Sequence, residues 1–184
     1  GSNPDDGFLF GAFANWVRYG YKKFPYSQHH HLSITAAASK VSLDIIYKGE
    51  FIRTVGNMDF TIDSRFHGDR FAYNFFGLGN ESINDVDKLS YNRVQNSLIY
   101  FNPNLRKLIT RGNGEFLIGG IFRRIGIENE HATNRFIAEF GEAIPDFFDS
   151  KLQLGAKMEF NYANLDNPLI THSGTKFRSS LSWE

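Results

Sequence analysis

The fold class is decided by the segment Val41-Ser42-Leu43-Asp44-Ile45-Ile46-Tyr47-Lys48-Gly49-Glu50-Phe51 and by Met58-Asp59-Phe60-Thr61-Ile62-Asp63. In both segments apolar side chains recur at every second position, and most of the positions between them are polar or charged. A period of two is the pattern of a β-strand whose two faces meet different surroundings. Gly56-Asn57 lies between the segments and predicts a two-residue hairpin turn. The pair therefore predicts an antiparallel hairpin with one apolar and one polar face.

The same alternation extends over most of the chain. We expect one all-β antiparallel domain of about eight strands joined up-and-down, at residues 7–21, 32–38, 41–51, 58–67, 91–101, 116–128, 152–162 and 175–184. Turns are expected at residues 22–27, at Ser39-Lys40, between Pro103 and Gly114, and over residues 164–174.

Three stretches give a less definite pattern. The parity of residues 7–21 is ambiguous, and so is that of residues 116–128, where Arg123 and Arg124 are adjacent. Residues 129–150 form the longest irregular segment. Within it, Ala138–Phe148 has some features of a short helix or lid, although Gly141 and Pro145 oppose a helix.

The composition narrows the class of protein. The 184 residues carry no net charge and no cysteine, so they predict no nucleic-acid partner and no thiolate site. Aromatic residues are abundant, with 19 Phe, 8 Tyr and 2 Trp, but there is no run of eighteen apolar residues that predicts a transmembrane helix. Gly1-Ser2 is typical of a cloning scar, and residues 3–184 are expected to form the domain.

Alternation alone does not say which face is inside. An eight-stranded soluble barrel places its apolar face inward around an apolar ligand, whereas an outer-membrane barrel places it outward into lipid. Several predicted strands reach the ~9–11 residues that a tilted strand needs to cross a bilayer. The polar positions also carry both signs of charge in mid-strand, which suits a hydrated lumen. These two features favour a transmembrane β-barrel, and the soluble barrel remains the alternative.

The aromatic residues near the predicted strand ends also favour a transmembrane β-barrel. Membrane barrels carry aromatic girdles at the two lipid–water interfaces. We therefore expect two groups of aromatic side chains to lie at such interfaces: Trp16, Tyr19, Tyr21, Phe24 and Tyr26 in one group, and Phe71, Tyr73, Phe75 and Phe76 in the other.

Several polar clusters suggest a site but are better explained structurally. His29-His30-His31 is interpreted as a polar rim. Neighbouring residues on a strand point to opposite faces, so at most His29 and His31 could share a metal ion. His67, His131 and His172 are far apart in the sequence. The pairs Asp59/Asp63 and Lys157/Glu159 are interpreted as ion-pair members, because no nucleophile accompanies them.

The loop after residue 76 is also expected to be structural. Gly77-Leu78-Gly79 is interpreted as a bend, because no helix follows to present its N-terminus to a phosphate. Asn80, Glu81, Asp85 and Asp87 lack the calcium-loop spacing and are expected to be solvated. A Ser–His pair for lipid hydrolysis has only His172 and Ser173 as candidates. No catalytic, cofactor-binding or metal-binding residue and no cofactor is predicted, and the chain is not expected to be an enzyme.

Four segments together resemble a known family. They are residues 5–12 (Asp-Asp-Gly-Phe-Leu-Phe-Gly-Ala), residues 22–26 (Lys-Lys-Phe-Pro-Tyr), Asn74–Asn80, and Asp166-Asn167-Pro168 with Gly174. The chain is similar, over essentially its whole length, to the C-terminal barrel of the Omp85 superfamily, the bacterial surface antigen D15 or BamA/TamA-like group. It looks most like the version found in Bacteroidetes-type bacteria, which often follows a calcineurin-like phosphoesterase domain.

The resemblance implies a sixteen-stranded barrel in the bacterial outer membrane, which serves as an anchor or in outer-membrane protein assembly or translocation. Its implied partners are the lipid bilayer with lipopolysaccharide, and either the second half of the barrel or another copy of the chain. This chain departs from the family pattern: it supplies only the first eight strands and lacks a Val/Ile-Arg-Gly-Phe/Tyr motif, a POTRA-like domain and a phosphoesterase motif. Any phosphoesterase activity is therefore expected outside it.

Overall fold

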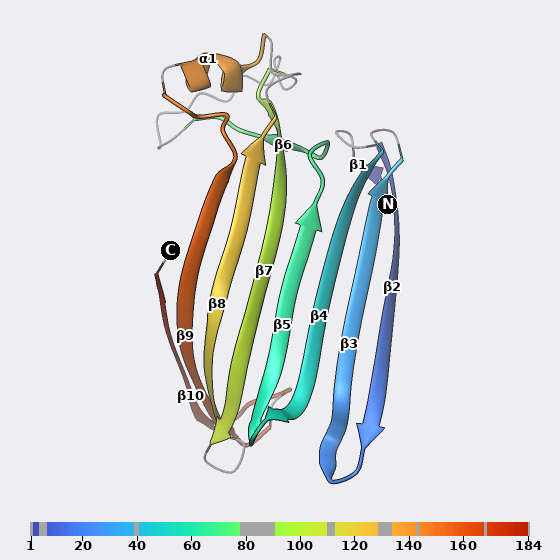
Figure 1. Cartoon of the computed structure of the whole chain (residues 1–184), viewed down its shortest axis with the longest axis vertical. Coiled ribbons are helices and arrows are strands. Elements are labelled where there is room, and N and C mark those ends of the chain that lie inside the picture. Colours follow the sequence, from blue (N-terminus) through green and yellow to red (C-terminus); the bar gives the residue numbers. More distant parts are fainter. Residues whose placement is uncertain are drawn as a thin grey trace.

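A computed structural model describes residues 2–3, 7–38, 41–77, 91–109, 113–128, 134–142, 144–167 and 169–183. The long strands are β2 (Gly7–Gly20), β3 (Lys23–Ala37), β4 (Ser42–Val55), β5 (Met58–His67), β7 (Arg93–Ile109), β8 (Gly114–Ile127), β9 (Lys151–Leu165) and β10 (Gly174–Trp183). They lie side by side in sequence order, each antiparallel to the next (Figure 1). The predicted all-β, up-and-down arrangement of eight strands is confirmed. Two short strands extend it, because β1 (Ser2–Asn3) pairs with β2 and β6 (Ala72–Asn74) pairs with β7.

The hairpin of β4 and β5 follows the sequence pattern closely. β5 has the predicted bounds, and the turn is formed by Gly56 and Asn57, with Val55 opposite Met58. Gly56 has φ of +61°, a backbone conformation that glycine adopts without strain. The remaining pairs run from Asp44–His67 to Phe51–Phe60, and on the apolar face they bring together Ile45 with Phe66 and Phe51 with Phe60.

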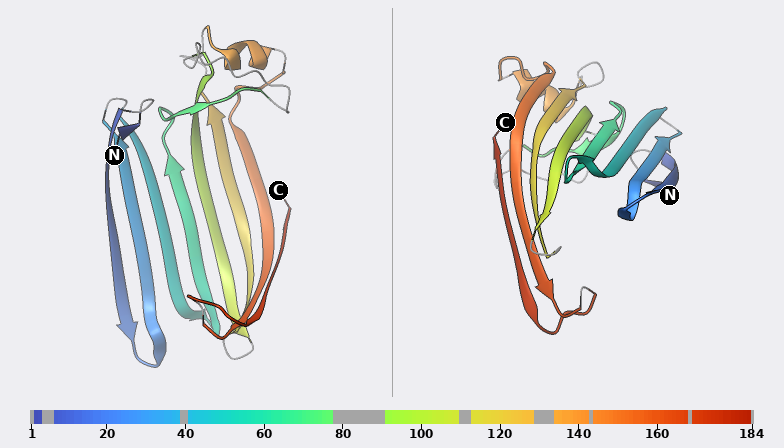
Figure 2. Two further views of the ribbon diagram at one scale, coloured as in Figure 1. Left: turned by 180° about the vertical axis from the view of Figure 1, so that it is seen from behind. Right: turned by 60° about the horizontal axis from the view of Figure 1, so that its bottom comes forward.

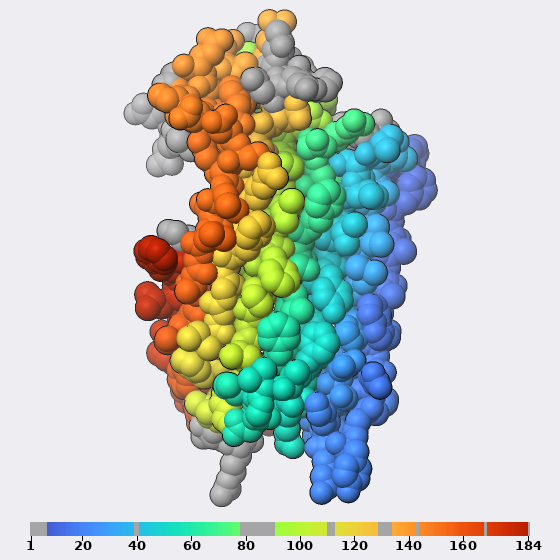
Figure 3. Space-filling model, in the orientation of Figure 1, coloured from blue at the N-terminus to red at the C-terminus, as the bar shows by residue number. Residues whose placement is uncertain are grey.

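The sheet is curved but open. β2 and β10 lie at its two sides, and no ladder joins them to each other among the described residues (Figure 2). A closed barrel is therefore not formed by these strands alone. Strands of adjacent colour pack closely across the surface seen in Figure 3, so the sheet is continuous from β2 to β9.

Two expected turns lie inside strands instead. The first connection is the pair Tyr21-Lys22, and β3 begins at Lys23. Pro25 therefore belongs to β3. It precedes the first residue paired with β4, Gln28, and it lies where the β2–β3 ladder shifts its register, so its missing N–H interrupts no regular pair. The second case is Pro103, which lies in the middle of β7, opposite Ile62 of β5.

A proline in a central strand removes a ladder hydrogen bond, and two asparagines compensate for it. The β7–β8 ladder has pairs Phe101–Phe122 and Asn104–Gly119 but none between them. There the Asn102 side-chain amide donates to the Gly120 carbonyl, and Asn104 Nδ2 donates to Asn102 O and Oδ1 at 3.1 Å. Asn102 is 1% exposed. The amide nitrogens of both side chains are thus hydrogen-bonded, as buried polar groups usually are, whereas Asn104 Oδ1 is buried without a partner.

Helix α1 (Phe136–Glu142) lies over the end of the sheet that carries β6 (Figure 1), and aromatic side chains pack between them. After His67 the chain bends and continues as β6 along the start of β7. Helix α1 begins somewhat before the expected helix at Ala138–Phe148. Phe75 contacts Phe136 and Phe140, with ring centroids 5.9 and 5.3 Å apart. Among the described residues no helix has the length and apolar character to span a membrane.

The stretch Asn74–Ser82 is described only as far as Gly77, which has φ of +100° and so fits the predicted bend. The prediction that Phe71, Tyr73, Phe75 and Phe76 form a girdle is not supported for three of them. Phe71 is buried against the His67 ring, Tyr73 is hydrogen-bonded to His67, and Phe75 packs under α1. Ser39-Lys40, Leu78–Ser90 and His131 lie outside the described residues.

The Asn102-Pro103-Asn104 arrangement predicts that alanine substitution has different effects on stability at two adjacent glycines, Gly119 and Gly120. A Cβ on Gly119 would overlap Asn104 Oδ1 and the Pro103 carbonyl, whereas one on Gly120 has its nearest neighbours at 3.9 and 4.0 Å. We expect Gly119→Ala to lower the free energy of unfolding by about 1–3 kcal/mol, the usual cost of overpacking. Gly120→Ala serves as the matched control and should unfold like the parent in urea titrations followed by tryptophan fluorescence. Equal stability of the two variants would contradict this account of Pro103.

Candidate functional site

The ladder registers assign every strand residue to one of two faces, because directly opposed residues share a face. The polar face carries charged and amide side chains from every strand after β2; its members include His29, His31, Asp44, Lys48, Glu50, Asp59, Asp63, Arg65, His67, Asn102, Asn104, Arg106, Glu115, Arg123, Lys157, Glu159, Asn161, Lys176 and Arg178. The apolar face includes Phe10, Leu43, Ile45, Phe60, Ile62, Phe66, Ile99, Phe101, Ile118, Leu154, Met158, Phe160, Phe177 and Leu181. The predicted division into these two faces is confirmed.

The exposure of the two faces is the reverse of what is usual in soluble proteins: many apolar side chains are exposed, and several charged ones are buried or partly buried. On the apolar face Phe101 is 42% exposed and Leu154 60% exposed, whereas Asp59 on the polar face is only 4% exposed. In soluble proteins large apolar side chains are usually inside and charged ones outside. A hollow of about 340 Å³ lies on the polar face between Lys48, Asp63, Arg65, Tyr100 and Arg123. The polar face is therefore the inner side of the curved sheet, and the apolar face is the outer side.

The two ambiguous segments take definite orientations. In β8, Arg123 is on the polar face above the Tyr100 ring, with its guanidinium carbon 5.9 Å from the ring centroid. Arg124 is on the apolar face but near the end of β8, where Nη2 is 3.4 Å from Ser150 Oγ. Strand β2 is apolar on both faces, since Phe13 and Val17 are exposed on the polar side.

Ion pairs join neighbouring strands across the polar face. Arg65 of β5 makes a two-pronged contact with Asp44 of β4, at 2.8 and 2.9 Å. Arg106 of β7 contacts Asp59 at 3.1 Å and Glu50 at 3.4 Å, and Tyr26 of β3 donates to Glu50 at 2.5 Å. This second cluster links β3, β4, β5 and β7.

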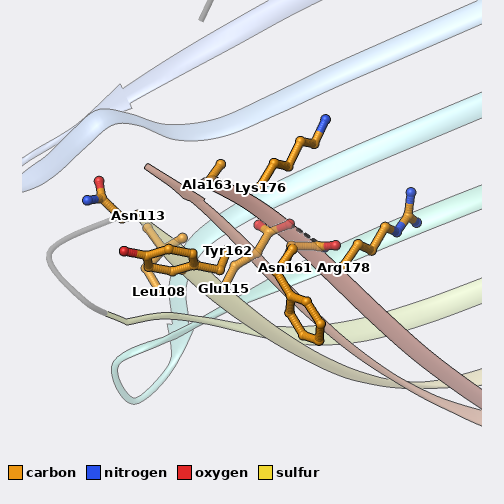
Figure 4. A pocket seen from close by; sticks show the side chains of 10 residues that line it. Leu108, Asn113, Glu115, Asn161, Tyr162, Ala163, Lys176 and Arg178 are labelled. Atoms are coloured by element: carbon orange, nitrogen blue, oxygen red, sulfur yellow. Dashed lines mark hydrogen bonds between the residues drawn. The ribbon is translucent and has the colours of Figure 1, made fainter. Parts of the chain in front are cut away.

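A third cluster joins β9 and β10. Lys157 Nζ is 3.2 Å from Glu159, and the exposed Arg178 contacts the same carboxylate at 3.3 Å. Nearby, a hollow of about 470 Å³ lies where β7 ends and β8 begins, beside β9 and β10 (Figure 4). Inside it Asn161 donates to Glu115 at 2.9 Å, and Lys176 and Arg178 project from β10. Polar side chains thus line this hollow from three strands.

The structure corrects the interpretation of the histidine run. His29, His30 and His31 lie in the middle of β3 rather than at a rim. His30 is on the apolar face, where it stacks on Trp16 at 4.7 Å and lies 2.9 Å from the Tyr47 hydroxyl. His31, on the polar face, lies 2.8 Å from Asn15 Oδ1. Gly49 is opposite His30, and its lack of a Cβ leaves space for the rings of Tyr47 and Phe51.

The other sequence candidates separate into different places. Asp59 and Asp63 share the polar face, but only Asp59 belongs to the Arg106 cluster. Lys157 and Glu159 form the expected ion pair. His172 and Ser173 lie in the connection between β9 and β10, where their backbone groups bond to Asp166. Among the described residues, no three His, Cys, Asp or Glu side chains are grouped to hold a metal ion.

One cluster was missed by the sequence analysis. His67 is buried, with Nδ1 3.2 Å from Asp44 Oδ1 and Nε2 2.7 Å from the Tyr73 hydroxyl. Phe71 stacks on the imidazole at 4.5 Å. The three polar residues come from β4, β5 and β6, so no spacing in the sequence marks them.

No family model, curated protein or solved structure matches the chain.

The Arg106 cluster is expected to contribute strongly to stability. Removing this guanidinium would leave the buried Asp59 carboxylate without its ionic partner, which costs about 3–5 kcal/mol in comparable pairs. We expect Arg106→Gln to lose that much free energy of unfolding. Arg178→Gln removes an exposed pair and should lose less than about 1 kcal/mol. Urea titration of both variants measures the difference, and similar losses would contradict the assigned role.

The β9–β10 connection is expected to depend on pH. Backbone hydrogen bonds, that of Ser173 first and then those of Asn167 and His172, hold the pKa of Asp166 below its ordinary value. A carboxylate with a lowered pKa in the folded state stabilises the loop at neutral pH, and this stabilisation is lost as the pH falls through that pKa.

The expected result is faster hydrogen exchange of the His172 amide in Asp166→Ala at neutral pH. The exposed Asp149, in the connection before β9, provides the control Asp149→Ala, which should not change that exchange. Unchanged protection in Asp166→Ala would show that the carboxylate does not hold the loop.

Proposed function

We propose that the chain is part of an outer-membrane β-barrel of the Omp85 or surface-antigen type. In this proposal it serves as a membrane anchor or in the assembly or translocation of outer-membrane proteins. The observation that carries the proposal is the inverted burial: the outer side of the curve is apolar and exposed, and the inner side is charged and partly buried. A barrel wall between lipid and a hydrated lumen requires this distribution.

The dimensions of the strands support the same proposal. Six of the eight long strands have 14–17 residues, more than the ~9–11 that cross the hydrocarbon region at a tilt. The additional residues extend beyond the hydrocarbon into the interfaces. Tyr19, Tyr21 and Phe24, which are exposed around the β2–β3 turn, fit an interfacial girdle at that end.

The open edges of the sheet require partners. Backbone groups in lipid must be hydrogen-bonded, so β10 and the part of β2 after Phe8, which no described strand pairs on its outer side, need neighbouring strands in a bilayer. In this proposal a second half of the barrel or another copy of the chain supplies them, and the bilayer with its lipopolysaccharide contacts the apolar face. The alternative, a soluble barrel with an apolar ligand inside, requires the apolar face to line the interior. The hollow beside Arg65 and Arg123 lies on the polar face, which weighs against it.

Cysteine scanning tests the proposal directly, because the chain has no cysteine of its own. Leu154→Cys and Met158→Cys place a fluorophore on the apolar face of β9, and Gln153→Cys and Lys157→Cys place it on the polar face. After reconstitution into lipid vesicles, a nitroxide attached to the lipid chains should quench the first pair strongly and the second pair weakly. If the protein did not enter vesicles and was a monodisperse monomer without detergent, this result would contradict the proposal and favour the soluble barrel.

A further inference from the structure

A buried histidine, a carboxylate and an exposed phenol form a relay near the end of the polar face. We propose that Tyr73 is a nucleophile activated by His67 and Asp44, which accepts an acyl group from an ester. The proposal is independent of the membrane assignment, because it rests on contacts within β4, β5 and β6.

The geometry is that of a nucleophile, a base and an orienting group. The Tyr73 hydroxyl is 2.7 Å from His67 Nε2, within the reach needed for proton transfer. Asp44 Oδ1 lies 3.2 Å from the other ring nitrogen, Nδ1, and acts on it by its negative charge, because the two atoms do not form an aligned hydrogen bond. The carboxylate favours the proton on Nδ1, so Nε2 is left to accept the phenolic proton.

The surroundings hold the base in place and favour the phenolate. The imidazole is 5% exposed, and Phe71 covers its face, so the ring has little freedom to turn away. Arg65 is bound to Asp44 and interacts electrostatically with the Tyr73 phenol. A guanidinium beside a developing phenolate stabilises the negative charge. Tyr73 is itself 46% exposed, so part of this side chain faces solvent, and the proposal requires an ester to approach the hydroxyl from that side.

A second tyrosine shows what distinguishes this environment. The Tyr91 hydroxyl donates to the Glu139 carboxylate at 2.7 Å, and this hydrogen bond raises the pKa of Tyr91. A carboxylate partner therefore keeps a phenol protonated. At Tyr73 the partner is an imidazole, which accepts the proton and leaves a reactive oxygen.

The proposed step balances without a further reactant. Tyr73 Oη forms a bond to the acyl carbon as the ester C–O bond breaks, and the phenolic proton passes to His67 Nε2. The alkoxide that leaves takes up this proton, and Tyr73 remains as an aryl ester. No oxidation or reduction occurs.

The test uses the full chain, folded in detergent, with p-nitrophenyl acetate as the probe. Peptide mass spectrometry measures the acetylation rate of each tyrosine. Tyr21 is the internal reference, because it is 88% exposed and has more access to the reagent than Tyr73. We expect Tyr73 to react about a hundredfold faster than Tyr21, at the lower end of what general-base assistance provides.

Variants assign that rate to the relay. His67→Gln should bring Tyr73 to the rate of Tyr21, and Asp44→Asn should lower it part of the way. His31→Gln replaces another histidine of the polar face and should leave the rate unchanged. The proposal is overturned if Tyr73 reacts within a few-fold of Tyr21 in the parent, a result that requires no variant to fold. It is also overturned if a folded His67→Gln variant keeps the parental rate.

Discussion

The registered hydrogen-bond ladder is the constraint on which the rest of the structure depends. Because side chains alternate along a strand, a register fixes the face of every residue, and a slip of one position would exchange the two faces. The registers observed from β3 to β10 keep most charged residues on one face of the sheet, and some of them, such as Lys48–Asp63 and Asp59–Arg106, are directly opposed. Cross-strand pairs such as Asp44–Arg65 are thus consequences of the ladder, and they also resist a slip, because slipping would carry their charges to the apolar face.

The centre of β7 shows how the sheet tolerates a residue, Pro103, that cannot complete the hydrogen-bond ladder. Pro103 has no N–H to donate, and the ladder to β8 is interrupted at that point. The Asn102 side-chain amide bonds across to Gly120 of β8, and Asn104 holds Asn102 in place from the same strand, but both side chains need room on the polar face. Gly119 provides that room because it has no Cβ. The proline, the two asparagines and the glycine therefore form one unit, although they belong to two strands.

The features that depend on neighbours in the chain could be predicted from the sequence, whereas contacts between distant strands could not. The alternation of Val41–Asp63 and the Gly56-Asn57 turn predicted a hairpin that the structure confirms, because both signals depend only on neighbours in the chain. Pro103 was misplaced in a turn, since its compensation by Asn102 depends on a carbonyl in another strand. His67 was overlooked for the same reason: Asp44 and Tyr73 reach it only after three strands have assembled. The His29–His31 run was placed at a rim because its polarity suggested solvent, whereas stacking with Trp16 supports His30 in mid-strand.

The two edges of the sheet differ in a way that bears on how it is completed. β2 and β10 run in opposite directions, so each can extend the sheet through an antiparallel neighbour, either a strand of a second half or the opposite edge of a second copy. β10 keeps the division of the faces, with Lys176 and Arg178 on one side and Phe177 and Leu181 on the other. β2 does not keep it, since Phe13 and Val17 add apolar surface to the polar side. A strand that is apolar on both faces is typical of one covered on both faces. The inner surface of the sheet therefore ceases to be uniformly polar at the β2 edge. A neighbour of β2 would have to contribute apolar side chains on the inner side as well as backbone hydrogen bonds.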